Sequence, residues 1–71
     1  MDTLTPEEIE LLKELVALLG EVPVAKACGA ARGTFARAVA GFRLNATTAI
    51  AIRVRAAGLA AEHFPQEAAA A

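Results

Sequence analysis

The chain has 71 residues, a formal net charge of −1, one cysteine and one histidine. A chain of this length forms one small domain, which buries only about 60% of the surface that the unfolded chain exposes. A single cysteine excludes an intramolecular disulfide, and the sequence contains no Cys/His cluster for a structural metal ion. We therefore expect helix packing, assisted by association between copies, to supply the stability.

The beginning of the chain lacks the features of a secretory leader, because Asp2 follows Met1 and further acidic residues follow in the first helix. The apolar runs are too short to span a bilayer. The sequence therefore predicts a cytoplasmic protein, without a membrane partner.

Charged residues occur in blocks rather than evenly. Residues 1–21 hold six acidic side chains and one lysine, whereas residues 22–58 hold six basic side chains and no acidic one. The basic residues are Lys26, Arg32, Arg37, Arg43, Arg53 and Arg55. Such an asymmetry gives the molecule one surface that repels a polyanion and another that can receive it.

The first predicted helix covers residues 5–20. Thr5 is a suitable N-cap, Pro6 occupies the first helical position, and Glu8 completes a capping box. Gly20 is expected to end the helix. Its apolar residues cover about half of the helix circumference. This arc is wide enough to serve both a core and a partner subunit.

Two short helices follow, at residues 23–28 and 32–40, with Gly29 between them. The loop 41–45 leads to a fourth helix, which Asn45 can cap and Gly58 is expected to end.

The fourth helix is expected to pack through one apolar face. Ile50, Val54 and Ala57 share that face, with Ile52 and Ala56 beside them, and Arg53 is expected to point away. One more short turn is possible before Pro65. We expect residues 65–71 to form a flexible tail outside a single domain at residues 1–64.

Two short helices joined at a glycine and followed by another helix correspond to the helix-turn-helix plan. Ala25 is small where the two helices would cross, and Gly29 can adopt the left-handed conformation that the turn needs. Apolar residues stand where side chains would close the angle between the helices: Val24, Cys28, Ala30, Phe35 and Val39. Arg32, Thr34 and Arg37 are then left facing outward.

On these residues, "VAKACGAARGTFARAVAG" resembles the helix-turn-helix of phage Cro and lambda-repressor-type (XRE-like) regulators. The resemblance extends through "TAIAIRVRAAGL" and covers roughly residues 9–59. It implies an all-α, lambda-repressor-like compact bundle of four to five short helices. It also implies that double-stranded DNA is the partner and that a recognition helix at about residues 31–40 enters the major groove.

The resemblance assigns roles to individual residues. Arg32 and Gly33 begin the recognition helix, and Ala36 and Arg37 follow one turn later on the same side, so these four residues are the candidate base readers. Arg32 and Arg37 lie about 7.5 Å apart along the helix axis, and bidentate contacts from arginine to guanine are the expected mode. The candidate phosphate contacts are Lys26, Thr34, Arg43 and Asn45, and the residues that shape the motif are Ala25, Gly29, Phe35 and Val39.

The sequence departs from the family in two places. Gly33 and Ala36 replace the polar readers of many relatives, and Glu21 lies in a segment that lacks the usual phosphate-binding glutamine. We therefore expect recognition to depend on the arginines, on contacts to thymine methyl groups, and on the spacing of a homodimer or of neighbours along the DNA.

Several other residues receive a structural interpretation. Cys28 is expected to be a small buried side chain, His63 and the arginines of the fourth helix to be solvated, and Phe42 to lie in the core. Phe64 is a candidate anchor for a dimer. The sequence contains no phosphate-binding glycine loop and no arrangement of catalytic carboxylates or of serine with histidine, so we expect no enzyme, cofactor, metal or small-molecule ligand.

The sequence thus predicts a small DNA-binding transcriptional regulator, most simply a repressor. Two alternatives remain. One is an architectural or plasmid-partition protein on repeated DNA sites. The other is a helical protein-interaction module, such as an antitoxin or adaptor, that works through the broad apolar arc of the first helix.

Overall fold

The computed structural model describes residues 2–64, which form four helices and no β-strand. The helices are α1 (Pro6–Leu19), α2 (Glu21–Ala27), α3 (Arg32–Val39) and α4 (Ala46–His63). The prediction of an all-α bundle is confirmed. The tail predicted at residues 65–71 lies outside the described part of the chain.

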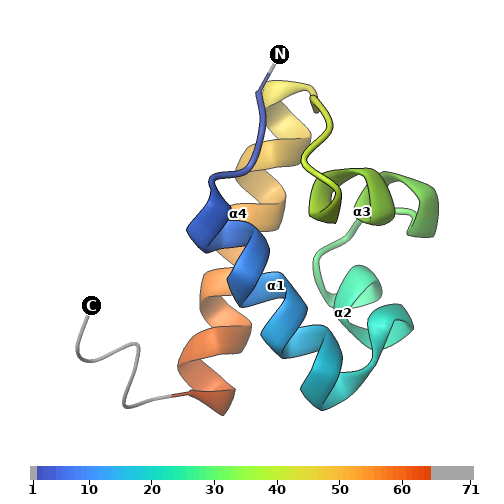
Figure 1. Cartoon of the computed structure of the whole chain (residues 1–71). Helices are drawn as coiled ribbons and strands as arrows, with labels where there is room; N and C mark the ends of the chain where they lie inside the picture. Colours follow the sequence, from blue (N-terminus) through green and yellow to red (C-terminus); the bar gives the residue numbers. More distant parts are fainter. Residues whose placement is uncertain (1, 65–71) are drawn as a thin grey trace.

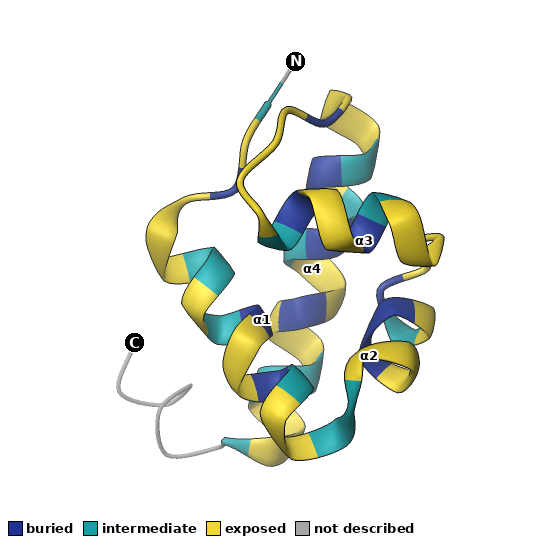
Figure 2. Cartoon of the chain, turned by 45° about the vertical axis from the view of Figure 1, so that its right-hand side comes forward, coloured by how far each residue is buried: buried dark blue, intermediate teal, exposed yellow. Residues whose placement is uncertain are grey.

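Helix α1 is the centre of the bundle, because it contacts each of the other three helices (Figure 1). The buried residues lie on the sides of the helices that face one another (Figure 2). Twelve apolar residues form this core: Leu4, Leu12, Leu15, Val24, Ala25, Cys28, Phe35, Ala38, Leu44, Ala49, Ile52 and Ala56. Within residues 2–64, no helix is both long and apolar enough to cross a membrane.

The capping box predicted for the first helix is present. The Thr5 Oγ1 accepts the Glu8 N–H at 3.2 Å, and the Glu8 Oε1 accepts the Thr5 N–H at 2.7 Å. Gly20 ends α1 at φ +96°, and α2 begins directly afterwards at Glu21, two residues earlier than predicted. Pro23 is compatible with this start because it lies in the first turn of α2, where its missing N–H breaks no helical hydrogen bond.

Helix α4 differs from the prediction in its buried face. Its buried residues are Ala49, Ile52 and Ala56, whereas Ile50 is 58% exposed and Val54 is 67% exposed. The prediction was wrong because apolar residues occur on more than one side of this helix. Only the position of α1 decides which side is covered, and the close approach there suits alanine.

Gly58 does not end α4, which continues to His63. A glycine inside a helix costs only about 1 kcal/mol. The additional turn brings Leu59 against the core and ends at His63, which is exposed as predicted.

Arg53 does not point into solvent, so that prediction was also wrong. Its Nε donates to Glu8 Oε2 at 2.8 Å, Nη1 to Asp2 Oδ2 at 3.0 Å, and Nη2 to the Thr3 carbonyl at 3.0 Å. Hydrogen bonding to Asp2 and then to Glu8 raises the pKa of Arg53, and the bond from Arg53 lowers the pKa of Asp2. One of the six basic side chains at positions 22–58 is therefore engaged in a structural ion-pair cluster.

The same N-terminal segment also holds the loop between α3 and α4. Asp2 and Leu44 exchange two backbone hydrogen bonds, of 2.7 and 2.6 Å. Asn45 caps α4 as predicted, since its Oδ1 accepts the Thr48 N–H at 2.8 Å. These contacts hold the end of the loop that leads into α4.

Candidate nucleic-acid interface

Helices α2 and α3 are joined by a short turn at residues 28–31, and we call residues 21–39 the α2–α3 unit. Gly29 has φ +69°, in the left-handed region. Its N–H donates to the Lys26 carbonyl at 3.0 Å, and the Ala30 N–H donates to the Ala25 carbonyl at 3.1 Å. This is the hydrogen-bond pattern of a Schellman ending. It turns the chain sharply, so that α3 leaves α2 at a fixed angle.

Apolar side chains fill the inner side of the α2–α3 unit. Val24, Cys28 and Phe35 are at most 1% exposed, Ala25 is buried, and Val39 is half-buried against the core. Burial raises the pKa of the Cys28 thiol, so this cysteine stays protonated and packs as a small apolar group. The inner side of α3 is thus occupied by the core, and only its outer side is available to a partner.

The four candidate base readers are all exposed on the outer side of α3: Arg32, Gly33, Ala36 and Arg37. At 100° per residue they lie within an arc of about 140°. A Cβ built on Gly33 would meet no atom within 4 Å. The outer side therefore consists of two long cationic side chains with small residues between them, and a groove wall could approach its backbone closely.

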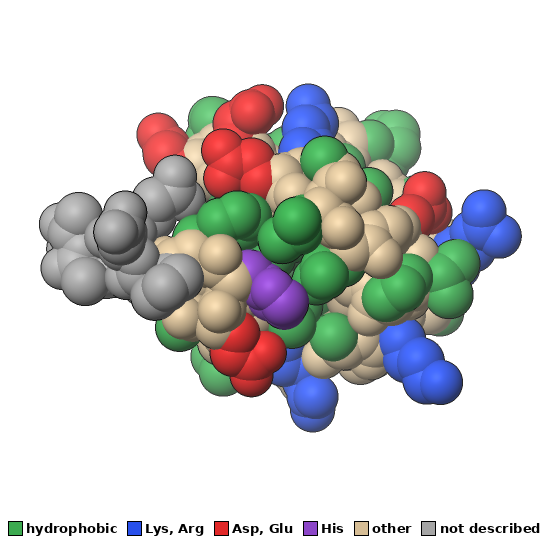
Figure 3. Space-filling view, turned by 90° about the horizontal axis from the view of Figure 1, so that it is seen from below, with side chains coloured by type: hydrophobic (Ala, Val, Ile, Leu, Met, Phe, Trp, Pro, Cys, Tyr) green, Lys and Arg blue, Asp and Glu red, His purple; other side chains and the backbone are tan. Residues whose placement is uncertain are grey.

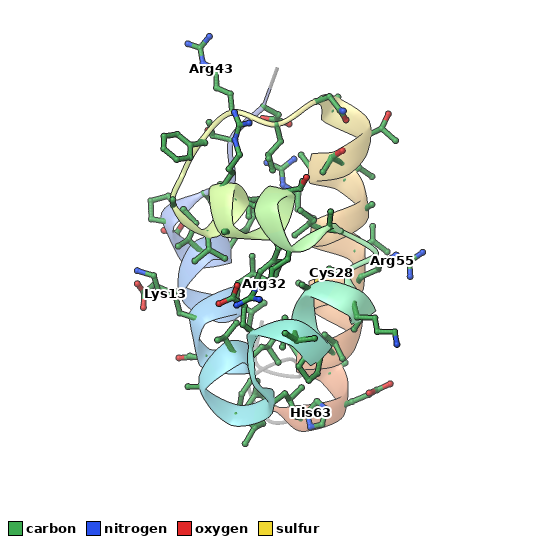
Figure 4. All side chains as sticks on the ribbon, turned by 90° about the vertical axis from the view of Figure 1, so that its right-hand side faces the viewer. Lys13, Cys28, Arg32, Arg43, Arg55 and His63 are labelled. Carbon is green, nitrogen blue, oxygen red and sulfur yellow. The ribbon has the colours of Figure 1, made fainter. Side chains whose placement is uncertain are left out.

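Arg32 is partly neutralised by an acidic neighbour. Its Nε lies 3.6 Å from Glu21 Oε1, and both side chains are largely solvated. Figure 4 shows Arg32 between α3 and the α2 segment below it. Glu21 thus lies beside one of the two arginines among the four candidate readers, and it would compete with any anionic ligand for that guanidinium.

Arg37 has a different neighbour, an aromatic ring. Its Cζ lies 5.8 Å from the centroid of the Phe42 ring, within the range of a cation–π contact. Phe42 is 57% exposed, so the prediction that it lies in the core was wrong.

The reason for this exposure is the end of α3. Gly41 has φ +85°, and the Phe42 N–H donates to the Arg37 carbonyl at 2.9 Å. In a Schellman ending, these two positions bring their side chains together. The ring therefore lies beside the guanidinium of Arg37 instead of entering the core.

The candidate phosphate contacts lie on three elements: Lys26 on α2, Thr34 on α3, and Arg43 and Asn45 in the loop before α4. Lys26, Arg43 and Asn45 are exposed, whereas Thr34 is half-buried at the edge of the helix. Because the Oδ1 of Asn45 caps α4, its amide nitrogen is the group that can donate to a phosphate. Arg43 projects outward from the loop after α3 (Figure 4).

Arg55, which the sequence did not assign to the site, places a positive charge near the turn between α2 and α3. Its Nη1 lies 3.5 Å from the Ala27 carbonyl, and a Cβ built on Gly29 would lie 3.5 Å from its Nε. The guanidinium thus sits at the C-terminal end of α2, where the helix dipole favours a positive charge. Only the fold brings it there, because Arg55 belongs to α4.

Apart from Arg32 and Arg53, which pair with acidic residues, the basic residues at positions 22–58 stay apart from the acidic residues at positions 1–21. Within residues 2–64, no acidic side chain lies within 4 Å of Lys26, Arg37, Arg43 or Arg55. Seen from the end at which α4 finishes, acidic side chains gather mainly along one edge, and most Lys and Arg side chains project from the other sides (Figure 3). The basic residues of the α2–α3 unit are thus kept apart from most of the acidic residues of α1.

The described part of the chain contains no group of three or more histidine, cysteine or acidic side chains that could hold a metal ion. The site therefore consists of cations, small residues and backbone at the outer side of α3. No protein-family model, curated protein or solved structure matches this chain, so its function has to be inferred from the site itself.

Proposed function

We propose that the protein is a helix-turn-helix DNA-binding regulator, most simply a repressor, whose α3 enters the major groove of double-stranded DNA. The observation that carries this proposal is the outer side of α3, where Arg32 and Arg37 flank small residues and no acidic residue belongs to the helix. The major groove is wide enough for an α-helix, and its edges present paired acceptors on guanine that suit arginine. Such a protein would work in the cytoplasm, at the bacterial nucleoid.

Arg37 is the principal base reader in this proposal. Its charge has no acidic partner within residues 2–64, and the Phe42 ring limits the directions in which its guanidinium can point. Arg32 has to leave Glu21 before it can bind a base, so it contributes less. Lys26, Arg43 and Arg55 supply phosphate contacts, which set the position of the helix but carry no sequence information.

A binding titration tests the proposal. The best duplex is first enriched from a randomised pool, and the protein is then titrated against it at two salt concentrations. Arg37→Ala should weaken binding by about 1–3 kcal/mol, roughly 5- to 150-fold, and should remove the preference at one base pair. Wild-type affinity should fall steeply with salt, because phosphate contacts release counterions.

Lys13→Ala is the matched control. It removes the same charge from α1, where Lys13 lies 3.7 Å from Glu10. The control should lower affinity much less than Arg37→Ala and should leave base preference unchanged. An Arg37→Ala variant with unchanged affinity and preference would show that α3 is not the reading helix.

The two alternatives can be weighed against the fold. An architectural or partition protein shares the same DNA face, and enrichment of tandem sites rather than one operator would favour it. The interaction module depended on the broad apolar arc of α1. Most of that arc is occupied by the core, and Leu18 is its one large apolar side chain that is more than half exposed. The arc of α1 therefore offers a partner less exposed apolar surface than that alternative assumes.

A further inference from the structure

Helix α4 carries a second apolar stripe, on the side that the core does not use. The stripe consists of Thr47, Ile50, Val54, Ala57 and Ala61, all of them exposed. Their spacing alternates between three and four residues, which is the spacing of a coiled-coil seam. A helix that is apolar on two sides is normally covered on both, so the second side needs a partner.

The chemistry of the stripe restricts the partner. It contains no charged residue, and small residues lie beside it at Ala51, Gly58 and Ala60. A Cβ built on Gly58 would meet nothing within 4 Å, so another helix could approach closely. The stripe is uncharged and partly aliphatic, with small residues beside it. Such a surface suits the apolar side of another helix and does not suit a polyanion.

A hollow adjoins the stripe at one of its residues, Ala57. A cavity of about 150 Å³ opens between α1 and α4, and its lining includes Leu11, Ile52 and Ala57. Its lining is almost wholly apolar, and the charge of Arg53 at its rim is already paired with Asp2 and Glu8. Filling the hollow with an aliphatic side chain would therefore leave no new charge unpaired.

We propose that this stripe is the surface through which two copies of the chain associate, with their α4 helices antiparallel about a two-fold axis close to Val54. Ile50 precedes Val54 by four residues and Ala57 follows it by three. The axis therefore places Ile50 of each copy over Ala57 and the hollow of the other. A two-fold interface requires one surface to carry both the projection and its receptor. The exposed side chains of the stripe supply the projection, and the hollow that adjoins the stripe at Ala57 supplies the receptor.

The proposal rests on the proposed function and deepens it, because binding to two half-sites about 34 Å apart calls for a two-fold dimer. It does not depend on DNA for its test. The test measures the mass of the protein in solution without DNA, by sedimentation equilibrium over a range of concentrations. The wild type should reach the mass of two chains, that is, twice 7.3 kDa.

Val54→Glu should raise the dimer dissociation constant by more than about tenfold, because the axis would bring two carboxylates together in an apolar contact. Val22→Glu is the matched control. Val22 is 58% exposed on α2, and the substitution introduces the same charge away from the stripe. It should leave the mass unchanged. Both sites are exposed, so neither substitution disturbs the core.

A cross-link tests the position of the axis directly. Val54→Cys should form a disulfide-linked dimer on mild oxidation, whereas Val22→Cys should not. Cys28 is 1% exposed and does not compete. A wild-type chain that stays monomeric at several hundred micromolar, a dimer that Val54→Glu leaves intact, or a Val54→Cys protein that does not cross-link would each overturn the proposal. A dimer that passes these tests but binds no DNA would leave it standing and would refute the DNA-binding function instead.

Discussion

The α2–α3 unit and helix α4 differ in how their sequences relate to their packing. In the α2–α3 unit, glycines mark the turns, and the apolar and polar residues alternate so that one side of α3 is buried and the other is charged. In α4, alanine, isoleucine and valine occur on several sides, and charge occurs at a few positions only. The α2–α3 unit has one apolar side to bury. Helix α4 has apolar residues on several sides, so it could pack through more than one face.

Glycine has opposite meanings in the two regions. Gly29 and Gly41 have positive φ, and they end α2 and α3. Gly58 is surrounded by helical residues, and α4 passes through it without a break. A glycine therefore ends a helix only where the following residues cannot gain burial by continuing it.

The largest expected effect contrasts two isoleucines of α4. Ile52 is 1% exposed and Ile50 is 58% exposed. Ile52→Ala should lower the free energy of unfolding by about 2–5 kcal/mol, and Ile50→Ala by less than about 0.5 kcal/mol. Urea unfolding of both variants in the Val54→Glu background, which removes any contribution from association, measures the difference. Equal costs would mean that the buried face of α4 is assigned wrongly.

The second contrast uses the two kinds of glycine. Gly29→Ala should destabilise the protein by about 1–2 kcal/mol, because alanine is strained at positive φ. Gly58→Ala should stabilise it by about 0.5–1 kcal/mol, because the helix interior favours alanine and the site is open. Thermal unfolding followed by circular dichroism should therefore show shifts of opposite sign. Two shifts of the same sign would contradict the distinction between turn and helix glycines.

A smaller effect concerns the ion pair of the α2–α3 unit. Glu21→Gln should strengthen DNA binding by up to about fivefold, since an exposed pair is worth at most about 1 kcal/mol and Arg32 would be released. The gain should vanish in an Arg32→Ala background, and this double-mutant cycle separates it from a general charge effect. Glu14→Gln, on α1, is the control for net charge. A gain that persists without Arg32 would show that Glu21 acts only through the overall field.

The smallest expected effect is the loss of stability at low pH through the ion pair between Asp2 and Arg53. The pKa of Asp2 is lowered in the folded state, so its stabilisation is present above the unfolded pKa of about 3.9 and is lost as pH falls through the lower folded value. Asp2→Asn should therefore reduce stability near neutral pH and flatten its decline below about pH 4. Urea midpoints at several pH values test this. An unchanged acid limb would mean that Asp2 contributes nothing to folding.

The sequence predicted the helix positions well wherever a local interaction decides them. The capping box at Thr5 and the cap at Asn45 need only neighbouring residues, and both are present in the structure. The turn at Gly29 is likewise local. The exposed positions of Arg32 and Arg37 followed from the burial of the opposite side of α3.

Long-range contacts were the ones that the sequence could not supply. Arg53 meets Asp2 and Glu8 from across the chain, Arg55 reaches the turn between α2 and α3, and Glu21 meets Arg32 across two helices. The sequence gives the charges of these residues, but their partners depend on the angles between the helices. Phe42 was misplaced because its backbone conformation, and not its apolarity, directs its ring.

By itself, then, the amino-acid sequence determined an all-α fold, the ends of most helices and the separation of acidic from basic residues, because these depend on local propensity and on periodicity. Only the tertiary structure decided which face of α4 is buried, which arginines have acidic partners, and that an apolar stripe faces outward. In an alanine-rich chain several faces of a helix can be buried at similar cost. The choice among them is made by the shape of the neighbouring helices, which no single segment specifies.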